Sequence, residues 1–168
     1  MEGKFLLLIF LLVASEVSGQ SINCDFADEP RGGTQLYSCN ANIQNPNGAD
    51  NIPITSSNGH FEYNEDYDVK MLNIVTGTSA LMPRVFCDQF FNLIVIEFLA
   101  NIQMSTINAE SFTGCTKIRE IFIRSNPIEV LPPTAFITNT YLKIFYLKDT
   151  QLTSLPSSLF ATNQALQD

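Results

Sequence analysis

The chain contains a single histidine, His60, which is the first candidate for acid–base chemistry. Histidine changes its charge near neutral pH and is therefore the most frequent general base in enzymes. A hydrolytic triad also needs a nucleophile, but the sequence has neither a G-x-S-x-G motif nor a reactive-cysteine motif. Because His60 follows the turn sequence Ser57-Asn58-Gly59, we expect an exposed loop residue without a catalytic role.

An acidic run follows this turn and contains four carboxylates: Glu62, Glu65, Asp66 and Asp68. Carboxylate oxygens are the ligands that Ca²⁺ prefers, but the spacing and the turn glycine of an EF-hand loop are missing. The glycine motifs of P-loop and dinucleotide-binding proteins are missing too. We therefore interpret the run as a solvated surface, and we expect no catalytic residues, no enzymatic activity, no metal and no cofactor.

Four cysteines allow three disulfide pairings: Cys24, Cys39, Cys87 and Cys115. An even number in an exported chain favours two disulfides. We favour Cys24–Cys39, because these two residues flank one short loop, and this choice leaves Cys87–Cys115 as the second pair. Zinc binding is the competing use, but no C-x-x-C pair occurs and His60 is distant from every cysteine in the sequence.

The N-terminal segment has the pattern of a secretory signal peptide. Lys4 precedes an apolar run over residues 5–14, and small residues follow at 17–19. Ten apolar residues are too few to cross a bilayer about 30 Å thick, which needs roughly 20 in a helix. The alternatives are an uncleaved anchor and a buried strand. We expect cleavage after Gly19, so that a secreted, extracellular chain begins at Gln20 without a membrane span.

Removal of residues 1–19 leaves 149 residues with 8 basic and 15 acidic side chains, a net charge of −7. This length fits one domain with a substantial core. An acidic chain repels phosphate backbones, so we expect neither a nucleic-acid partner nor an anionic membrane surface.

Apolar residues recur about every 24 residues in the second half of the chain. In the unit that starts at Ile118, positions 1, 4, 6, 11 and 14 are apolar, and Asn, Pro and Phe stand at 9, 15 and 19. The residues are Ile118, Ile121, Ile123, Asn126, Ile128, Leu131, Pro132 and Phe136, followed by Leu142, Phe145, Leu147, Thr150, Leu152, Leu155, Pro156 and Phe160. Earlier units start at Leu93, with one extra residue near Gln103, and more faintly at Val69, while Leu166 opens a further unit.

This pattern resembles the leucine-rich repeat at its typical extracellular length, and the resemblance covers about residues 69–168. The I-x-C-D-F, Y-S-C, F-C-D-Q-F and F-T-G-C segments resemble secreted leucine-rich-repeat proteins of insects. Two departures are Thr150 in the Asn position and the lack of a cysteine-rich C-terminal cap. An amphipathic helical array is the alternative, but prolines at repeated places and β-branched residues in the strands disfavour it.

The resemblance implies an α/β-type repeat solenoid: a short horseshoe with a parallel β-sheet on its concave face and irregular or 3-10 returning segments. We place the units near 69–92, 93–117, 118–141 and 142–165, with an incomplete unit from 166. Residues 20–68 do not follow the repeat, and we expect them to form a disulfide-linked N-terminal cap with short strands at 22–26 and 35–43.

Positions 3, 5 and 7 of each unit alternate with buried positions and are expected on the concave face. In the first unit they are Met71, Asn73 and Val75; the partner-binding candidates in later units are Val95, Glu97, Leu99, Glu120, Phe122, Arg124, Ile144, Tyr146 and Lys148. Exposed apolar patches with aromatic and arginine anchors are typical of interaction sites. The alternatives are that the N-terminal segment covers this face, or that β-propensity alone selected these residues.

We therefore expect a non-catalytic recognition protein that binds a protein, or a glycan, through the concave face. The resemblance implies extracellular roles that include immune recognition. Alternatives are a self-assembling structural subunit and a fragment of a longer leucine-rich-repeat receptor. Three explanations compete for the uncapped end near Leu166: truncation, a homodimer through the last strand, and coverage by the final turn.

Overall fold

The computed structural model describes residues 19–61 and 63–167. The predicted signal peptide, apart from Gly19, lies outside the described residues. Within them, no helix has both the length and the apolar character that a membrane span requires.

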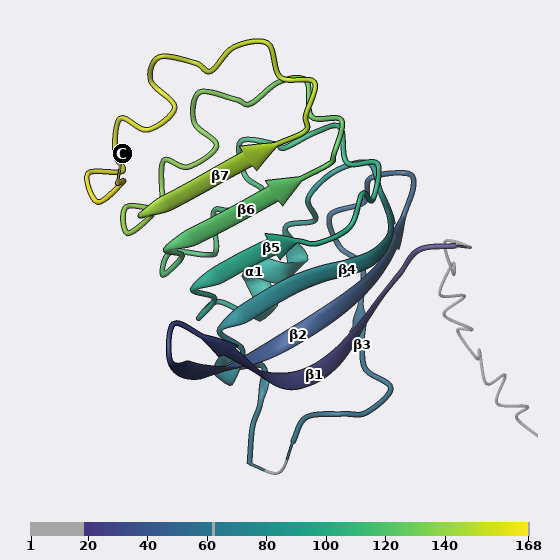
Figure 1. Ribbon diagram of the computed structural model, residues 1–168. Coiled ribbons are helices and arrows are strands. Elements are labelled where there is room, and N and C mark those ends of the chain that lie inside the picture. The colour runs from purple at the N-terminus through teal and green to yellow at the C-terminus, as the bar shows by residue number, and fades with distance from the viewer. Residues whose placement is uncertain (1–18, 62, 168) are drawn as a thin grey trace, which may run out of the picture.

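One seven-stranded sheet organises the chain, with the strand order β3-β1-β2-β4-β5-β6-β7 (Figure 1). The strands are β1 Ser21–Arg31, β2 Thr34–Asn45, β3 Ile54–Thr55, β4 Met71–Ser79, β5 Val95–Phe98, β6 Glu120–Arg124 and β7 Ile144–Lys148. Only β1 and β2 pair in the antiparallel sense, and every other pair of neighbours is parallel. The sheet is therefore mostly parallel, as the sequence predicts.

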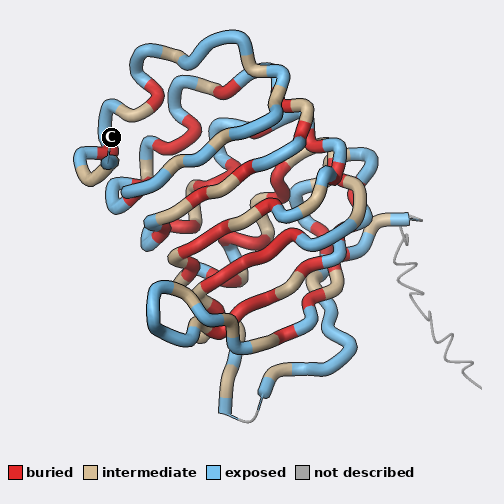
Figure 2. The backbone as a smooth tube through the Cα atoms, in the orientation of Figure 1, coloured by how far each residue is buried: buried red, intermediate tan, exposed pale blue. Residues whose placement is uncertain are grey.

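Helices are few in the described part of the chain: the five-residue helix α1, Val85–Gln89, and the 3-10 helix η1, Asp66–Asp68. The segments that return from one parallel strand to the next lie behind the sheet and consist mostly of turns (Figure 1). The core lies between these segments and the sheet. Burial is greatest along the central strands and decreases toward β7 (Figure 2).

The parallel strands pair in the register that the sequence predicts. Met71, Val95, Glu120 and Ile144 stand side by side, at intervals of 24, 25 and 24 residues. The longer interval contains Gln103, whose φ of 61° marks the place of the extra residue. Consequently Leu72, Ile96 and Ile121 form one buried row.

The asparagine at position 9 has the expected role in one unit. Asn126 is fully buried, and its Oδ1 accepts from the amides of Ile102 and Met104 at 3.1 and 3.2 Å. Its Nδ2 donates to the carbonyls of Ala100 and Arg124 at 3.2 and 2.8 Å. Asn101, in the preceding unit, is exposed and bonds only within its own loop, to Gln103. Of these two asparagines, only the buried Asn126 bonds the backbone of the preceding unit.

The hairpin β1–β2 forms the N-terminal end of the sheet and is longer than the predicted strands at 22–26 and 35–43. Its turn is Gly32-Gly33, and both residues have positive φ, 55° and 85°. A Gly-Gly pair is suited to a two-residue hairpin turn that needs positive φ twice. Cys24 and Cys39 are joined by a disulfide across this hairpin.

The second disulfide joins Cys87, in α1, to Cys115, in the next returning segment. Both predicted pairs are thus confirmed, and the described residues contain no free cysteine. Two disulfides are consistent with an extracellular protein, because reducing compartments rarely preserve them.

The sheet ends at β7. Behind this strand, a hollow of about 370 Å³ is lined mostly by apolar side chains, which include Phe145, Leu147 and Leu155. Leu155 is 53% exposed, in contrast to Leu131, its buried counterpart one unit earlier. The core beside β7 is therefore partly open, although Leu166 of the final turn packs against it.

Candidate functional site

His60 is not the solvated loop residue that the sequence analysis expects. Its ring stacks on Phe26, with centroids 3.9 Å apart. Its Nδ1 lies 3.1 Å from the hydroxyl of Tyr37, and its Nε2 lies 2.9 Å from Oδ1 of Asp66. The turn residues Ser57, Asn58 and Gly59 are exposed as predicted, but His60 itself is only partly exposed, because these partners hold its imidazole against β1 and β2.

These contacts, together with two further hydrogen bonds, hold the loop that contains His60 against the rest of the fold. The Tyr37 hydroxyl also accepts from the amide of Phe61 at 3.0 Å, and Asp66 accepts from Nε2 of Gln89 at 2.9 Å. Burial raises the pKa of Tyr37, nearby carboxylates raise it further, and the bond from Phe61 opposes them. Since both ring nitrogens of His60 have protein partners, a structural role accounts for this residue.

The acidic run also has local structural partners. Glu65 and Asp68 form a reciprocal capping box around η1. Asp66 bonds His60 and Gln89, as described above. No group of three or more metal-ligating side chains occurs within the described residues.

The sheet face turned away from the core is the surface on which the sequence places the partner-binding candidates; we call it the solvent face. Two rows of side chains cross it from strand to strand. One row is Asn40, Asn73, Glu97, Phe122 and Tyr146, and the other is Ser38, Met71, Val95, Glu120 and Ile144.

Arg31, at the tip of the β1–β2 hairpin, reaches across part of this face. Its Nε and Nη2 bond Oε2 of Glu120 at 3.2 and 2.6 Å, and its Nη1 bonds Oε1 of Glu97. Its guanidinium lies 4.9 Å from the centre of the Phe122 ring. Burial lowers the pKa of Arg31, but the hydrogen bonds and charges of Glu120 and Glu97 outweigh burial and raise it. The N-terminal segment therefore covers part of the solvent face.

One predicted binding residue is not accessible. Val95 is only 1% exposed, and its neighbours in the row are the buried Met71 and the partly buried Glu120. Asn73, predicted to face solvent, is buried as well, and its Nδ2 bonds Oδ1 of Asn40 at 2.8 Å. Met71 is also buried.

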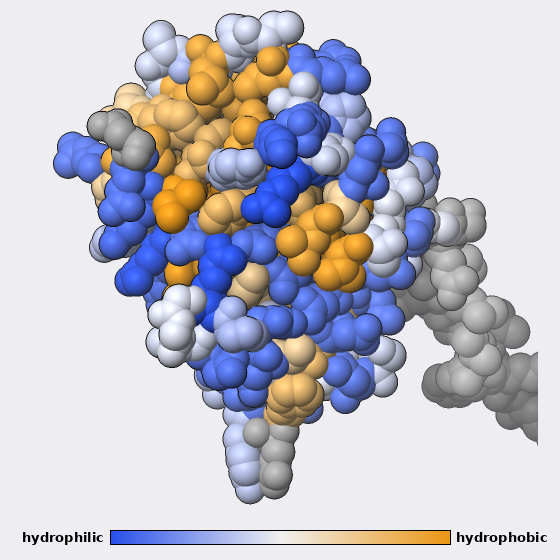
Figure 3. Space-filling model, viewed as in Figure 1, coloured by the Kyte–Doolittle hydropathy of each residue, from blue (hydrophilic) through white to orange (hydrophobic). Residues whose placement is uncertain are grey.

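The remainder of the solvent face, over β6 and β7, is more exposed, with Phe122 partly accessible beside Arg31. We call it the aromatic patch, and its residues are Phe122, Arg124, Ile144, Tyr146 and Lys148. The rings of Phe122 and Tyr146 lie 6.0 Å apart, and the guanidinium of Arg124 lies 5.3 Å from the Tyr146 ring. On this view of the molecule, hydrophobic patches lie among hydrophilic side chains (Figure 3). The patch therefore offers two aromatic rings, each with an arginine beside it.

Eight of the nine predicted residues are at least partly accessible, and Val95 is the exception. Leu99, just after β5, is 53% exposed. The sequence analysis did not identify Arg31 as a residue of this face. The adjacent Gly32-Gly33 pair, which is typical of a hairpin turn, could have placed Arg31 at the tip of a hairpin. No protein-family model and no curated protein matches the sequence.

Proposed function

We propose that the protein is a secreted, non-catalytic protein of the leucine-rich-repeat type that binds a protein partner through the aromatic patch. The solvent face is then the concave face of a short horseshoe. Residues 20–68 serve as its N-terminal cap, with Arg31 reaching from the cap onto the binding face.

The strand register supports the repeat assignment. From β4 to β7, consecutive parallel strands are offset by 24 or 25 residues, which is within the range of this repeat class. The buried positions also recur: Ile121 and Ile123 point into the core as Ile96 and Phe98 do. A single unit cannot bury such a face alone, so stacking is what stabilises it.

One observation carries the binding proposal: Phe122 and Tyr146 lie side by side on an open sheet face, with Arg31 and Arg124 against their rings. Aromatic and arginine side chains are enriched among the residues that dominate binding energies at interfaces. Rings already held by neighbouring side chains also lose little conformational freedom when a partner binds.

The contacts of His60 support a non-catalytic role. In a hydrolytic triad the histidine bonds a carboxylate and a hydroxyl that is open to the substrate, whereas Tyr37, which supplies the hydroxyl here, is buried. In this protein both nitrogens bond the side chains of Tyr37 and Asp66.

Self-association is the second candidate function, and the exposed end beside β7 favours it. Unpaired strand edges and open apolar cores both promote pairing with another chain. Sedimentation equilibrium at several concentrations separates the two functions. A monomer at all concentrations disfavours self-association, and a stable dimer favours it.

The test of the binding proposal is affinity capture from extracellular fluid of the source, with quantitative mass spectrometry. Immobilised wild-type protein is compared with Tyr146→Ala and with Phe91→Ala. Phe91 is a suitable control because it is 50% exposed and lies outside the sheet. We expect one set of proteins to bind wild type and Phe91→Ala but to be depleted with Tyr146→Ala.

Equal capture by all three proteins would reject the aromatic patch as the binding surface. Loss with both variants would indicate a general effect of exposed aromatic groups rather than a specific site. Thermal unfolding of each variant is measured in parallel, so that a folding defect is not read as a binding defect.

A further inference from the structure

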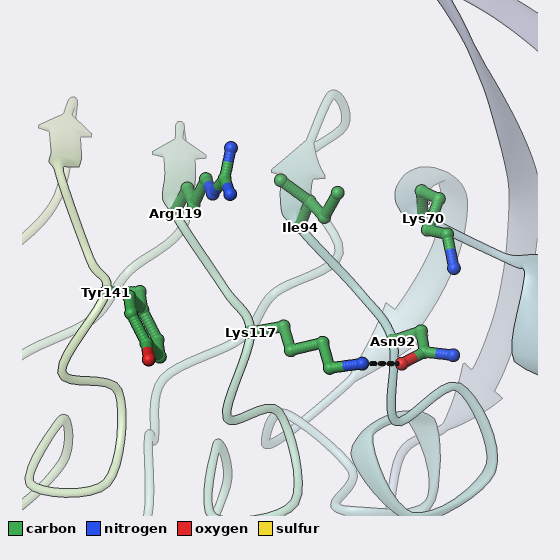
Figure 4. Close-up of a pocket in the computed structure, with 6 residues that line it drawn as sticks. All are labelled: Lys70, Asn92, Ile94, Lys117, Arg119 and Tyr141. Carbon is green, nitrogen blue, oxygen red and sulfur yellow. Dashed lines mark hydrogen bonds between the residues drawn. The ribbon is translucent and has the colours of Figure 1, made fainter.

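A basic hollow lies at the edge of the sheet where the parallel strands begin (Figure 4). Its volume is about 460 Å³, and its lining is Lys70, Asn92, Ile94, Lys117, Arg119 and Tyr141. Lys70, Ile94 and Arg119 immediately precede β4, β5 and β6. The hollow is therefore built by equivalent positions of neighbouring strands, and it lies on the sheet's edge rather than on the solvent face.

The charges of this lining are all positive. Three of its six residues are cations and none is acidic. Lys70 Nζ donates to the carbonyl of Tyr67 at 3.1 Å, and Lys117 Nζ donates to Oδ1 of Asn92 at 2.6 Å. Both acceptors are neutral, and across residues 19–61 and 63–167 no carboxylate forms an ion pair with any of these three cations.

This arrangement contrasts with the rest of the chain. The whole sequence carries 17 acidic against 9 basic side chains. Among the described residues, Arg31 and Arg84 are held in ion pairs, whereas Arg124, Lys143 and Lys148, like the cations of the hollow, are not. A local cluster of uncompensated cations focuses a positive potential that attracts anions even to an acidic protein.

The spacing of the cations suits a linear ligand. Neighbouring strands lie about 4.8 Å apart, so Lys70 and Arg119, two strands apart, are separated by roughly 10 Å at the backbone. The row crosses the strands and continues toward β7, because the amide of Lys143 bonds the carbonyl of Arg119 at 2.8 Å. A single small anion can reach one or two of these cations, whereas a chain with repeated anionic groups can bind them in succession.

The two lining residues Ile94 and Tyr141 further restrict the kind of ligand that fits the hollow. Ile94 lies between the two strand-edge cations, and the Tyr141 ring is 62% exposed beside them. An exposed aromatic ring can pack against the C–H face of a sugar. Binding of single-stranded nucleic acid, by comparison, generally uses several stacked aromatic side chains, and only Tyr141 lines this hollow.

We propose that the basic hollow is a second binding site, for a linear sulfated polysaccharide. Sulfate groups would bind Lys70, Lys117 and Arg119, while a sugar ring would pack on Tyr141. This site does not depend on the aromatic patch, because the two surfaces share no residue.

Heparin-affinity chromatography with a salt gradient tests the proposal. We expect wild-type protein to be retained at physiological salt, and Lys117→Gln and Arg119→Gln each to elute at lower salt. The triple variant Lys70→Gln/Lys117→Gln/Arg119→Gln should not be retained. The control Arg84→Gln removes one charge outside the hollow and should elute with the wild type.

Failure of the wild type to bind, or elution of the triple variant at the wild-type salt concentration, would overturn the proposal. An equal shift for Arg84→Gln would also overturn it, since net charge alone would then explain retention. Lys117 and Arg119 are exposed, so we expect unchanged thermal unfolding for the single variants. If the triple variant fails to fold, these single variants decide the question.

Competition experiments identify the ligand chemistry. Dextran sulfate should displace the protein from heparin at a sulfate concentration at which inorganic sulfate and uncharged dextran do not. Equal competition by inorganic sulfate would contradict a site for a linear chain. Tighter binding to single-stranded DNA than to heparin, or binding only to phosphatidylcholine vesicles that contain phosphatidylserine, would contradict a polysaccharide ligand.

Discussion

Side chains along β6 point alternately into the core and onto the solvent face. Those in the core stabilise the fold, and those on the solvent face are available to a partner. Ile123 is fully buried, whereas Phe122 lies on the solvent face beside Tyr146. We predict that Ile123→Ala lowers the free energy of unfolding by about 2–5 kcal/mol, because it leaves a cavity in the core. Phe122→Ala should lower it by only about 1 kcal/mol, through lost contacts with Arg31 and Tyr146.

Urea unfolding of both variants, followed by circular dichroism, measures this difference. The proposed strand phase requires Ile123→Ala to be clearly the less stable variant. Equal destabilisation would show that Phe122 also belongs to the core and is unavailable for binding.

Tyr37 provides a second prediction at this scale. Burial raises its pKa above the ordinary value of 10.0. A pKa that is higher in the folded than in the unfolded protein means that the neutral form stabilises the fold. This contribution is complete below the unfolded pKa and is lost as the pH rises through the folded pKa.

Tyrosinate absorbance during an alkaline titration measures this effect. One of the five tyrosines should ionise later than the others, and Tyr37→Phe should remove that late step. A late step that persists in Tyr37→Phe would assign it to another tyrosine and contradict the predicted burial effect.

The sequence could place individual residues only where neighbours along the chain determine their environment. The burial of Ile121 and Ile123 follows from strand alternation and was predicted. The coverage of Glu97 and Glu120 was not predicted, because Arg31, which bonds them, is 66 and 89 residues away in the sequence. The partners of His60 are likewise distant in sequence, so the turn motif beside it was not sufficient.

At the scale of elements, the pairing of β2 with β4 contains a register shift between Ala41 and Asn42. Gly77 pairs with Ile43 in this region and has a φ of 123°. A Cβ at Gly77 would lie 1.8 Å from the carbonyl oxygen of Ile43. We predict that Gly77→Ala lowers the free energy of unfolding by about 3 kcal/mol or more, because backbone must move.

Gly32→Ala is the matched control for this prediction. Gly32 also has a positive φ, 55°, but an added Cβ would meet nothing within 4 Å. Gly32→Ala should therefore lower the free energy of unfolding by about 1 kcal/mol, because only the backbone conformation is strained. If denaturant unfolding shows equal losses of stability for the two variants, the backbone at Gly77 can move away from Ile43 at little cost in free energy.

The elements were predicted well where the repeat pattern is regular. The strand register from β4 to β7 and both disulfides follow from apolar spacing and cysteine positions. The length of the β1–β2 hairpin and the helix α1 were not predicted, because residues 20–92 match the repeat only weakly. Hairpin length depends on cross-strand pairing, which a single sequence reveals only through the Gly32-Gly33 turn.

At the scale of the whole molecule, the account requires export. The apolar run at 5–14 and the small residues before Gln20 predict removal of residues 1–19. N-terminal sequencing of protein recovered from the medium of secreting cells should begin at Gln20 or within a few residues of it. Recovery of the uncleaved chain in the membrane fraction would contradict export.

The solvent face and the strand edge of the molecule differ in the chemistry of their exposed side chains. Arg31 pairs with both Glu97 and Glu120 and covers the N-terminal part of the solvent face, so the aromatic patch over β6 and β7 is the more exposed part. The basic hollow with Lys70, Lys117 and Arg119 lies on the strand edge instead. Two ligands of different chemistry could therefore bind at the same time.

The most direct test of the central claim is site-specific photo-cross-linking at the aromatic patch. A photoreactive phenylalanine analogue replaces Tyr146 in one protein and Phe91 in another, and both are irradiated in extracellular fluid of the source. The account predicts a discrete cross-linked product of defined mass from position 146 and none from position 91. No product from position 146, or the same products from both positions, would contradict a binding function for the aromatic patch.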